Sequence, residues 1–146
     1  GGGTGFLAPE EQARREAEDL RGCGNALVGP ILRALLDLGV EPVVNAPATD
    51  LLVEDGAVTG VRIELDGEET VVRARRGVVL ATGGFEWNQQ LVTEMLRGPM
   101  TGPAGVPTNT GDGLLMSMRA GARLANLGQA WWVPVVRIPG DVAFGE

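Results

Sequence analysis

The sequence predicts an α/β fold in which a small antiparallel meander of three strands is inserted into a larger parallel sheet. Residues 49–75 alternate apolar and polar side chains and contain two Asp-Gly dipeptides at the spacing of hairpin turns. Val78 to Ala81 are continuously apolar, which is typical of a strand buried on both faces of a parallel sheet. Residues 25–38 and 112–122 carry the helical apolar period. This order of elements favours a meander that serves as a crossover between parallel strands.

The first part of the chain predicts two helices and a short strand. Pro9 and the acidic residues after it favour a polar, solvated helix over residues 9–21. A second helix covers 25–38, or begins at Pro30, and its apolar stripe is expected to face the core. Gly39 suits the left-handed end of this helix. A strand over 40–45 follows, at the start or edge of a sheet because it contains a proline.

The middle of the chain predicts the meander itself. Its strands cover about 49–54, 58–65 and 69–75. They are joined by Asp55-Gly56 and Asp66-Gly67, which are typical two-residue hairpin turns. One face of the second strand carries mainly apolar side chains, so we expect the meander to lie on a larger body.

A buried strand over 77–82 is expected to follow and to end at Thr82-Gly83-Gly84. In an open α/β sheet, ligands bind just past the carboxyl ends of the strands, where these glycines would let a backbone come close. An ordinary corner between a strand and a loop explains the same residues. Asn88 then caps a helix over about 89–97.

Thr110-Gly111-Asp112-Gly113 opens the helix over 112–122. The N-terminus of a helix attracts anions, but Asp112 would repel a phosphate and is better suited to accept from hydroxyl groups, such as those of a ribose or ribityl chain. Simple N-capping by Thr110 or Asp112 is the alternative.

The composition excludes several classes of function. The net charge is −7 and no run of basic residues occurs, so we expect neither a nucleic acid nor an anionic membrane surface as partner. No apolar stretch approaches the roughly 20 residues of a membrane span. A single cysteine cannot form an internal disulfide, which favours the cytoplasm. His, Lys and Tyr are absent, so the usual acid–base groups are missing and no catalytic residue is assigned.

Four motifs occur together in one order: Asn25-Ala26-Leu27, the stretch from Ala48 to Val61, Ala81-Thr82-Gly83-Gly84-Phe85 and Thr110-Gly111-Asp112-Gly113. In this combination the chain resembles the FAD-binding flavoprotein family of fumarate reductase and succinate dehydrogenase. The later Ala130-Trp131-Trp132-Val133-Pro134 favours the branch of this family that is similar to 3-ketosteroid dehydrogenases.

The resemblance implies part of a Rossmann-like FAD-binding domain, with FAD as the cofactor. It implies that the backbone of Ala48 pairs with the adenine edge. The segment Ala81, Thr82, Gly83 and Gly84 would lie along the adenosine and diphosphate, where the missing glycine side chains make room. Asp112 would lie against the flavin nucleotide.

The chain departs from the family at the phosphate loop. That loop reads G-x-G-x-x-G between a strand and a helix, whereas Gly1 to Gly5 have no strand before them and Phe6 replaces the last glycine. We therefore expect residues 1–146 to form only part of the domain, with 1–21 as a polar helical lead-in and 123–146 as the start of a further segment. By itself the chain should bind FAD weakly or not at all.

The predicted function is hydride transfer between a flavin and a carbonyl-activated C–C bond, as a dehydrogenase or a reductase, on a small apolar or carbonyl substrate. Trp131 and Trp132 either line an apolar substrate pocket or belong to a core or interface. A non-catalytic α/β binding module is the alternative from another class. A nicotinamide-dependent enzyme is disfavoured because no intact dinucleotide fingerprint is present.

Overall fold

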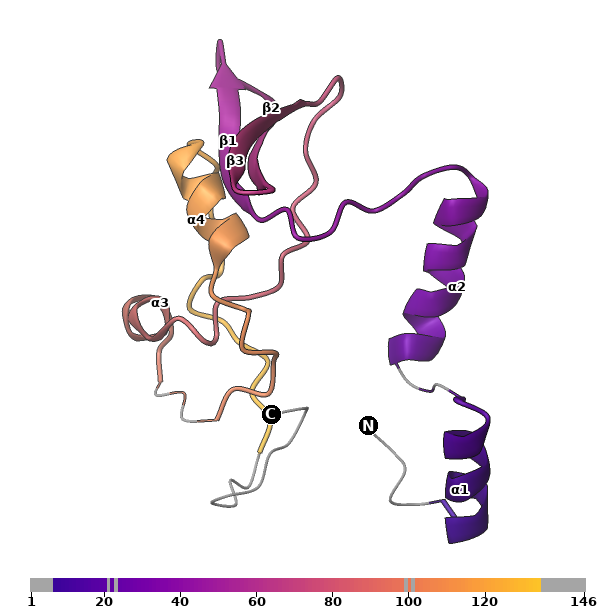
Figure 1. Cartoon of the computed structure of the whole chain (residues 1–146). Coiled ribbons are helices and arrows are strands. Elements are labelled where there is room, and N and C mark those ends of the chain that lie inside the picture. Colours follow the sequence, from indigo (N-terminus) through magenta and orange to yellow (C-terminus); the bar gives the residue numbers. More distant parts are fainter. Residues whose placement is uncertain (1–6, 21, 23, 99, 101, 135–146) are drawn as a thin grey trace. The chain divides into compact units, whose positions relative to one another are not determined.

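The computed structural model describes residues 7–20, 22, 24–98, 100 and 102–134 (Figure 1). The glycine-rich start and the segment after 134 lie outside the described residues. Contacts between residues divide the described part of the chain into two compact units, one up to Val43 and one from Val44 onward. Every predicted site residue belongs to the second unit.

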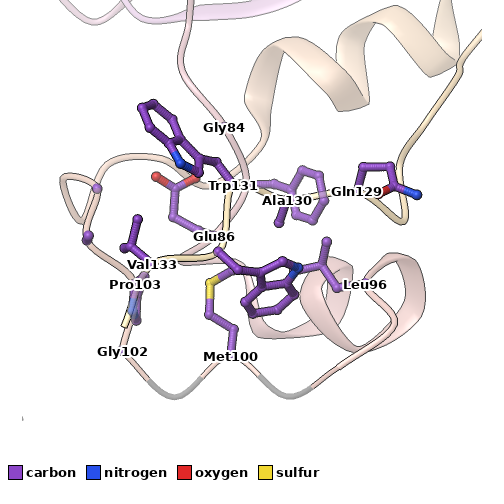
Figure 2. A pocket seen from close by; sticks show the side chains of 14 residues that line it. Gly84, Glu86, Leu96, Met100, Gly102, Pro103, Gln129, Ala130, Trp131 and Val133 are labelled. Atoms are coloured by element: carbon purple, nitrogen blue, oxygen red, sulfur yellow. The ribbon is translucent and has the colours of Figure 1, made fainter. Parts of the chain in front are cut away.

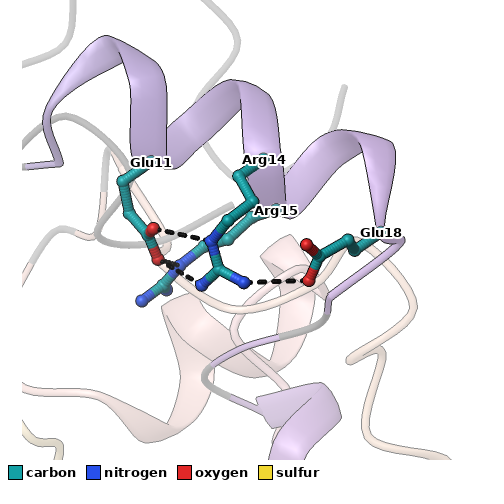
Figure 3. A network of polar contacts seen from close by, with 4 residues as sticks. All are labelled: Glu11, Arg14, Arg15 and Glu18. Atoms are coloured by element: carbon teal, nitrogen blue, oxygen red, sulfur yellow. Dashed lines mark hydrogen bonds and ion pairs between the residues drawn. The ribbon is translucent and has the colours of Figure 1, made fainter.

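The first helix, α1, covers Pro9–Ala17 and begins with the proline in its first turn, as predicted. The Glu11 carboxylate accepts hydrogen bonds from Arg14 at 2.9 Å and from Arg15 at 2.7 Å, and Arg14 also binds Glu18 (Figure 3). These two guanidinium groups lower the pKa of Glu11 to about 2. The helix has no buried residue, which confirms a solvated element.

The second helix, α2, covers Gly24–Asp37 and contains Pro30, so it begins before the proline. Gly39 has a φ of 72° and ends the helix in the left-handed conformation that was predicted. The expectation that the apolar stripe of α2 is core is wrong for the described structure, because no residue of the helix is buried and Leu27 is 67% exposed. A stripe of this kind is buried only where another element covers it.

The strand predicted over 40–45 is absent from the described structure. Residues 40–44 are irregular, and Val43 and Val44 are 68% and 72% exposed. Their β-branched side chains favour an extended chain, but a strand also needs a neighbour that completes its backbone hydrogen bonds.

The meander forms as predicted, as one antiparallel sheet in the order β1-β2-β3 (Figure 1). Its strands are β1 (Ala48–Glu54), β2 (Ala57–Leu65) and β3 (Glu68–Arg73). In both turns the Asp and the Gly have positive φ, between 52° and 81°. That conformation matches the type I′ turn, whose twist suits two antiparallel strands.

The buried parallel strand predicted over 77–82 is not found. These residues belong to no strand in the described structure, and Val79 is 92% exposed. A strand buried on both faces requires partners along its edges and layers above and below, and the described residues provide neither. The described sheet is therefore purely antiparallel.

The rest of the second unit contains two short helices. Helix α3 covers Gln89–Met95, and the side chain of Asn88 caps it by accepting from the amide of Leu91 at 3.2 Å, as predicted. Helix α4 covers Asp112–Arg119 and lies alongside β1 (Figure 1). The core of the unit comprises three buried apolar side chains, Leu91, Val92 and Met116.

Candidate functional site

The two glycine-containing segments that the sequence marked as functional lie side by side. The amide of Gly111 donates to the carbonyl of Gly84 at 3.0 Å, and the amide of Trp87 donates to the carbonyl of Asn109 at 3.1 Å. The indole of Trp87 also donates to the carbonyl of Gly105 at 2.8 Å. We call residues 82–88 and 105–113 together the glycine junction.

Glycine allows this close approach at several points of the junction. A side-chain carbon at Gly113 would overlap the hydroxyl of Thr82, and one at Gly83 would overlap the amide of Asn109. Gly83 also has a φ of 77°, which disfavours any residue with a Cβ atom. The space beside these glycines is thus taken by the chain itself. That these glycines make room for a cofactor therefore stays a prediction. Close packing of the chain against itself also requires glycine at these positions.

Glu86 and Asn109 are the polar pair at the centre of the junction. The side-chain amide of Asn109 donates to Oε1 of Glu86 at 2.6 Å, and the pair is partly buried. The carboxylate also fills the space where side chains on Gly84 and Gly105 would stand. Sequence reasoning missed both residues. The one available signal was that each is a polar residue directly beside a glycine motif.

Asp112 is exposed at the first position of α4. The hydroxyl of Thr110 donates to its Oδ1 at 2.9 Å. The interpretation that Thr110 or Asp112 caps the helix is wrong, because the N-cap is Gly111 in the left-handed conformation and no side chain caps the helix. Asp112 therefore presents an acceptor to solvent beside the exposed segment 81–84.

Ala48 lies at the start of β1 and is half-buried. The structure connects this region to α4 through Arg119, which donates to the carbonyl of Thr49 at 3.0 Å and binds Asp50 at 3.3 Å. Ala48 is thus in the same unit as the glycine junction, but no described contact joins it directly to Gly83, Gly84 or Asp112.

A cavity of about 590 Å³ adjoins the junction, and Gly84 and Glu86 form part of its wall (Figure 2). Trp131 is 94% exposed and Trp132 is 51% exposed, and both line this cavity. Their exposure excludes a core role within the described structure. The remaining lining residues are Phe85, Leu96, Met100, Gly102, Pro103, Ala104, Gly105, Gln129, Ala130 and Val133.

The described residues contain no helix long and apolar enough to cross a membrane. They also contain no group of three or more His, Cys, Asp and Glu side chains that could hold a metal ion.

The described residues thus bring together an exposed backbone segment with two glycines, a carboxylate at a helix start and a cavity with two tryptophans on its wall. The sequence model of one family, described as FAD binding domain, matches residues 7–143. The chain belongs to this family. The match confirms the predicted family and its cofactor, FAD.

Two known enzymes are similar in sequence to most of this chain. The 3-oxosteroid 1-dehydrogenase of Mycobacterium tuberculosis strain H37Rv is 41% identical over 90% of this chain. The 4-oxocyclohexanecarboxylate 2-dehydrogenase of Sinomonas cyclohexanicum is 38% identical over 98% of it. The chain spans 25% of the length of each.

A solved structure has a similar fold over most of this chain. The 3-ketosteroid delta1-dehydrogenase of Sterolibacterium denitrificans, in complex with 1,4-androstadiene-3,17-dione, is 40% identical and superposes with a TM-score of 0.77. The superposition covers 83% of this chain and 23% of the dehydrogenase.

Proposed function

We propose that this chain forms part of the FAD site, within a Rossmann-like domain, of a cytoplasmic FAD-dependent dehydrogenase. The observation that carries the proposal is the glycine junction, in which the hydrogen bond from Gly111 to Gly84 brings segment 81–84 beside the start of α4. These are the two places that the family resemblance assigns to the cofactor.

The residues of the junction suit a dinucleotide. Segment 81–84 is exposed and offers backbone amides and the hydroxyl of Thr82, which are donors for phosphate and ribose oxygens. Asp112 offers an acceptor for ribose or ribityl hydroxyl groups. The backbone of Ala48, at the start of β1, would pair with the adenine edge. A site with donors along one segment and one acceptor beside it matches the alternating chemistry of FAD.

FAD, when bound, supplies hydride transfer to or from a C–C bond next to a carbonyl group. The chain's own residues would bind and orient the cofactor, because the sequence has no His, Lys or Tyr to serve as acid or base. The names of the relatives favour a dehydrogenase over a reductase and a cyclic ketone as substrate. The cavity beside Gly84, with Trp131 and Trp132 on its wall, is suited to an apolar ring system of this class.

A chimera tests this proposal. The chain would replace the matched segment of the Mycobacterium tuberculosis enzyme, of which it spans 25%. We expect the purified chimera to keep the visible flavin absorbance and to dehydrogenate a 3-oxosteroid. An Asp112→Asn variant of the chimera should lose flavin, whereas Glu64→Gln, which changes an exposed carboxylate of β2, should retain it. A folded chimera without flavin, or equal flavin contents in both variants, would contradict the proposal.

A further inference from the structure

We propose that Glu86 is a positioning residue that holds segment 82–84 at a fixed distance from the start of α4. Its carboxylate accepts from Asn109 at 2.6 Å, and Asn109 lies three residues before Asp112. Glu86 itself follows Gly84 by two residues. One side-chain contact therefore joins the two segments that carry the proposed cofactor contacts.

The other contacts across the junction are neutral. Two are backbone hydrogen bonds, from Gly111 to Gly84 and from Trp87 to Asn109. Two more run from a side chain to a backbone carbonyl, from the indole of Trp87 to Gly105 and from the amide of Asn88 to Thr110. A hydrogen bond to an ionised carboxylate is roughly twice as strong as a neutral one. Partial burial further reduces competition from water. The hydrogen bond between Asn109 and Glu86 is thus the strongest single contact between the two segments of the junction.

The surroundings of Glu86 are shaped around its carboxylate. Side chains at Gly84 and Gly105 would both overlap carboxylate oxygens of Glu86, so glycine on either side lets the group insert between the segments. The same residue forms part of the cavity wall beside Gly84 (Figure 2). A side chain placed in this way determines how the backbone of Gly84 is presented to a ligand. This consequence for FAD rests on the function proposed above, whereas the positioning itself does not.

Hydrogen exchange of the full chain tests the positioning. The amide of Gly111, which donates to Gly84, should exchange slowly in the wild type. Asn109→Asp would place two carboxylates in contact, and we expect it to speed the exchange of this amide by about tenfold, the loss of one charge-assisted hydrogen bond. The double variant Glu86→Gln with Asn109→Asp exchanges donor and acceptor between the two positions, and it should restore slow exchange.

Glu94→Gln is the matched control, because Glu94 also accepts from a side-chain amide, that of Gln90 at 2.9 Å, but is exposed. It should leave the exchange of Gly111 unchanged. Rescue by the exchanged pair is a result that a general loss of stability would not give. Unchanged exchange in Asn109→Asp, or no rescue in the double variant, would overturn the proposal.

A second measurement separates this inference from the proposed function. The measurement is FAD titration of the chimera described above, because the chain by itself is expected to bind FAD weakly or not at all. We expect Asn109→Asp in the chimera to weaken the affinity about tenfold and the double variant to recover it. Absence of FAD binding by all folded chimera variants, with the expected exchange pattern in the chain, supports the positioning and contradicts the proposed function. Equal FAD affinities in the wild type and in Asn109→Asp would overturn the role of Glu86 toward the ligand.

Discussion

Arg119 donates from Nη2 to the backbone carbonyl of Thr49 at 3.0 Å, and its Nε lies 3.3 Å from the carboxylate of Asp50. One guanidinium group at the last residue of α4 thus binds the start of β1, directly beside Ala48. Thr49 and Arg119 are 70 residues apart in the sequence. It connects the meander to the helix that begins at Asp112.

We expect Arg119→Ala to destabilise the second unit by about 0.5–1 kcal/mol, since both partners of the ion pair are about half exposed. Arg119→Lys should recover only part of the loss, because an ammonium group lacks the fork that reaches two acceptors. Urea unfolding measures both changes. Arg123→Ala, which removes an exposed arginine without a described side-chain partner, should be close to neutral. Equal effects of Arg119→Ala and Arg123→Ala would contradict the link.

Gly83 is predicted to be more sensitive than other glycines with positive φ. Gly83→Ala should lower the free energy of unfolding by about 1–2 kcal/mol through backbone strain. The overlap of the new side chain with Asn109 should lower it further. Gly121 is the matched control, since its φ of 79° equals that of Gly83 within 2° and open space surrounds it. Thermal unfolding of both variants should show the larger loss for Gly83→Ala. Equal losses would mean that strain alone accounts for the effect.

The side chain of Asn88 has two functions that substitution can separate. Its oxygen caps α3 at the amide of Leu91, and its nitrogen donates to the carbonyl of Thr110 at 3.0 Å. Asn88→Ala should destabilise the unit by about 1 kcal/mol for the cap, and more for the lost donor. Asn88→Asp keeps the cap, so we expect an intermediate stability in urea unfolding. A variant Asn88→Asp as unstable as Asn88→Ala would show that the bond to Thr110 dominates.

The elements that depend on neighbouring residues were predictable from the sequence. The turns at Asp55 and Asp66, the cap at Asn88 and the left-handed Gly39 all formed where expected, because their conformation is set within a few residues. The pairing of β2 with β3 runs without a shift from its two-residue turn, whereas β1 and β2 pair with two register shifts that the turn does not set.

The elements that depend on distant partners were not predictable from the sequence. The apolar run at Val79 favours a buried strand, but whether it becomes one depends on neighbours that the described residues do not supply. The pair of Glu86 and Asn109 is 23 residues apart in the sequence, and neither residue type indicates the other. The positions of Gly83 and Asp112 as a candidate site were predictable only as a combination of motifs, because each motif alone has an ordinary structural explanation.

The contacts of Glu11 predict that α1 depends on pH. Its pKa is about 2 in the folded chain against an ordinary 4.5, mainly because Arg14 and Arg15 donate to the carboxylate. A lowered pKa means that the folded state binds fewer protons than the unfolded state. The stabilisation of α1 by the Glu11 carboxylate is therefore complete above pH 4.5 and is lost as the pH falls toward 2.

We expect the Cα chemical shifts of α1 to move toward coil values across this range, and the Glu11 carboxyl to titrate near its lower end. Glu11→Gln should weaken the helix at neutral pH and remove this pH dependence. Glu10→Gln changes the other glutamate of the first turn, which has no described partner, and should preserve it. High salt should reduce the difference between these variants, because the ion pairs are exposed and screened. An α1 helix equally stable at pH 2 and pH 6 would contradict the role of this network.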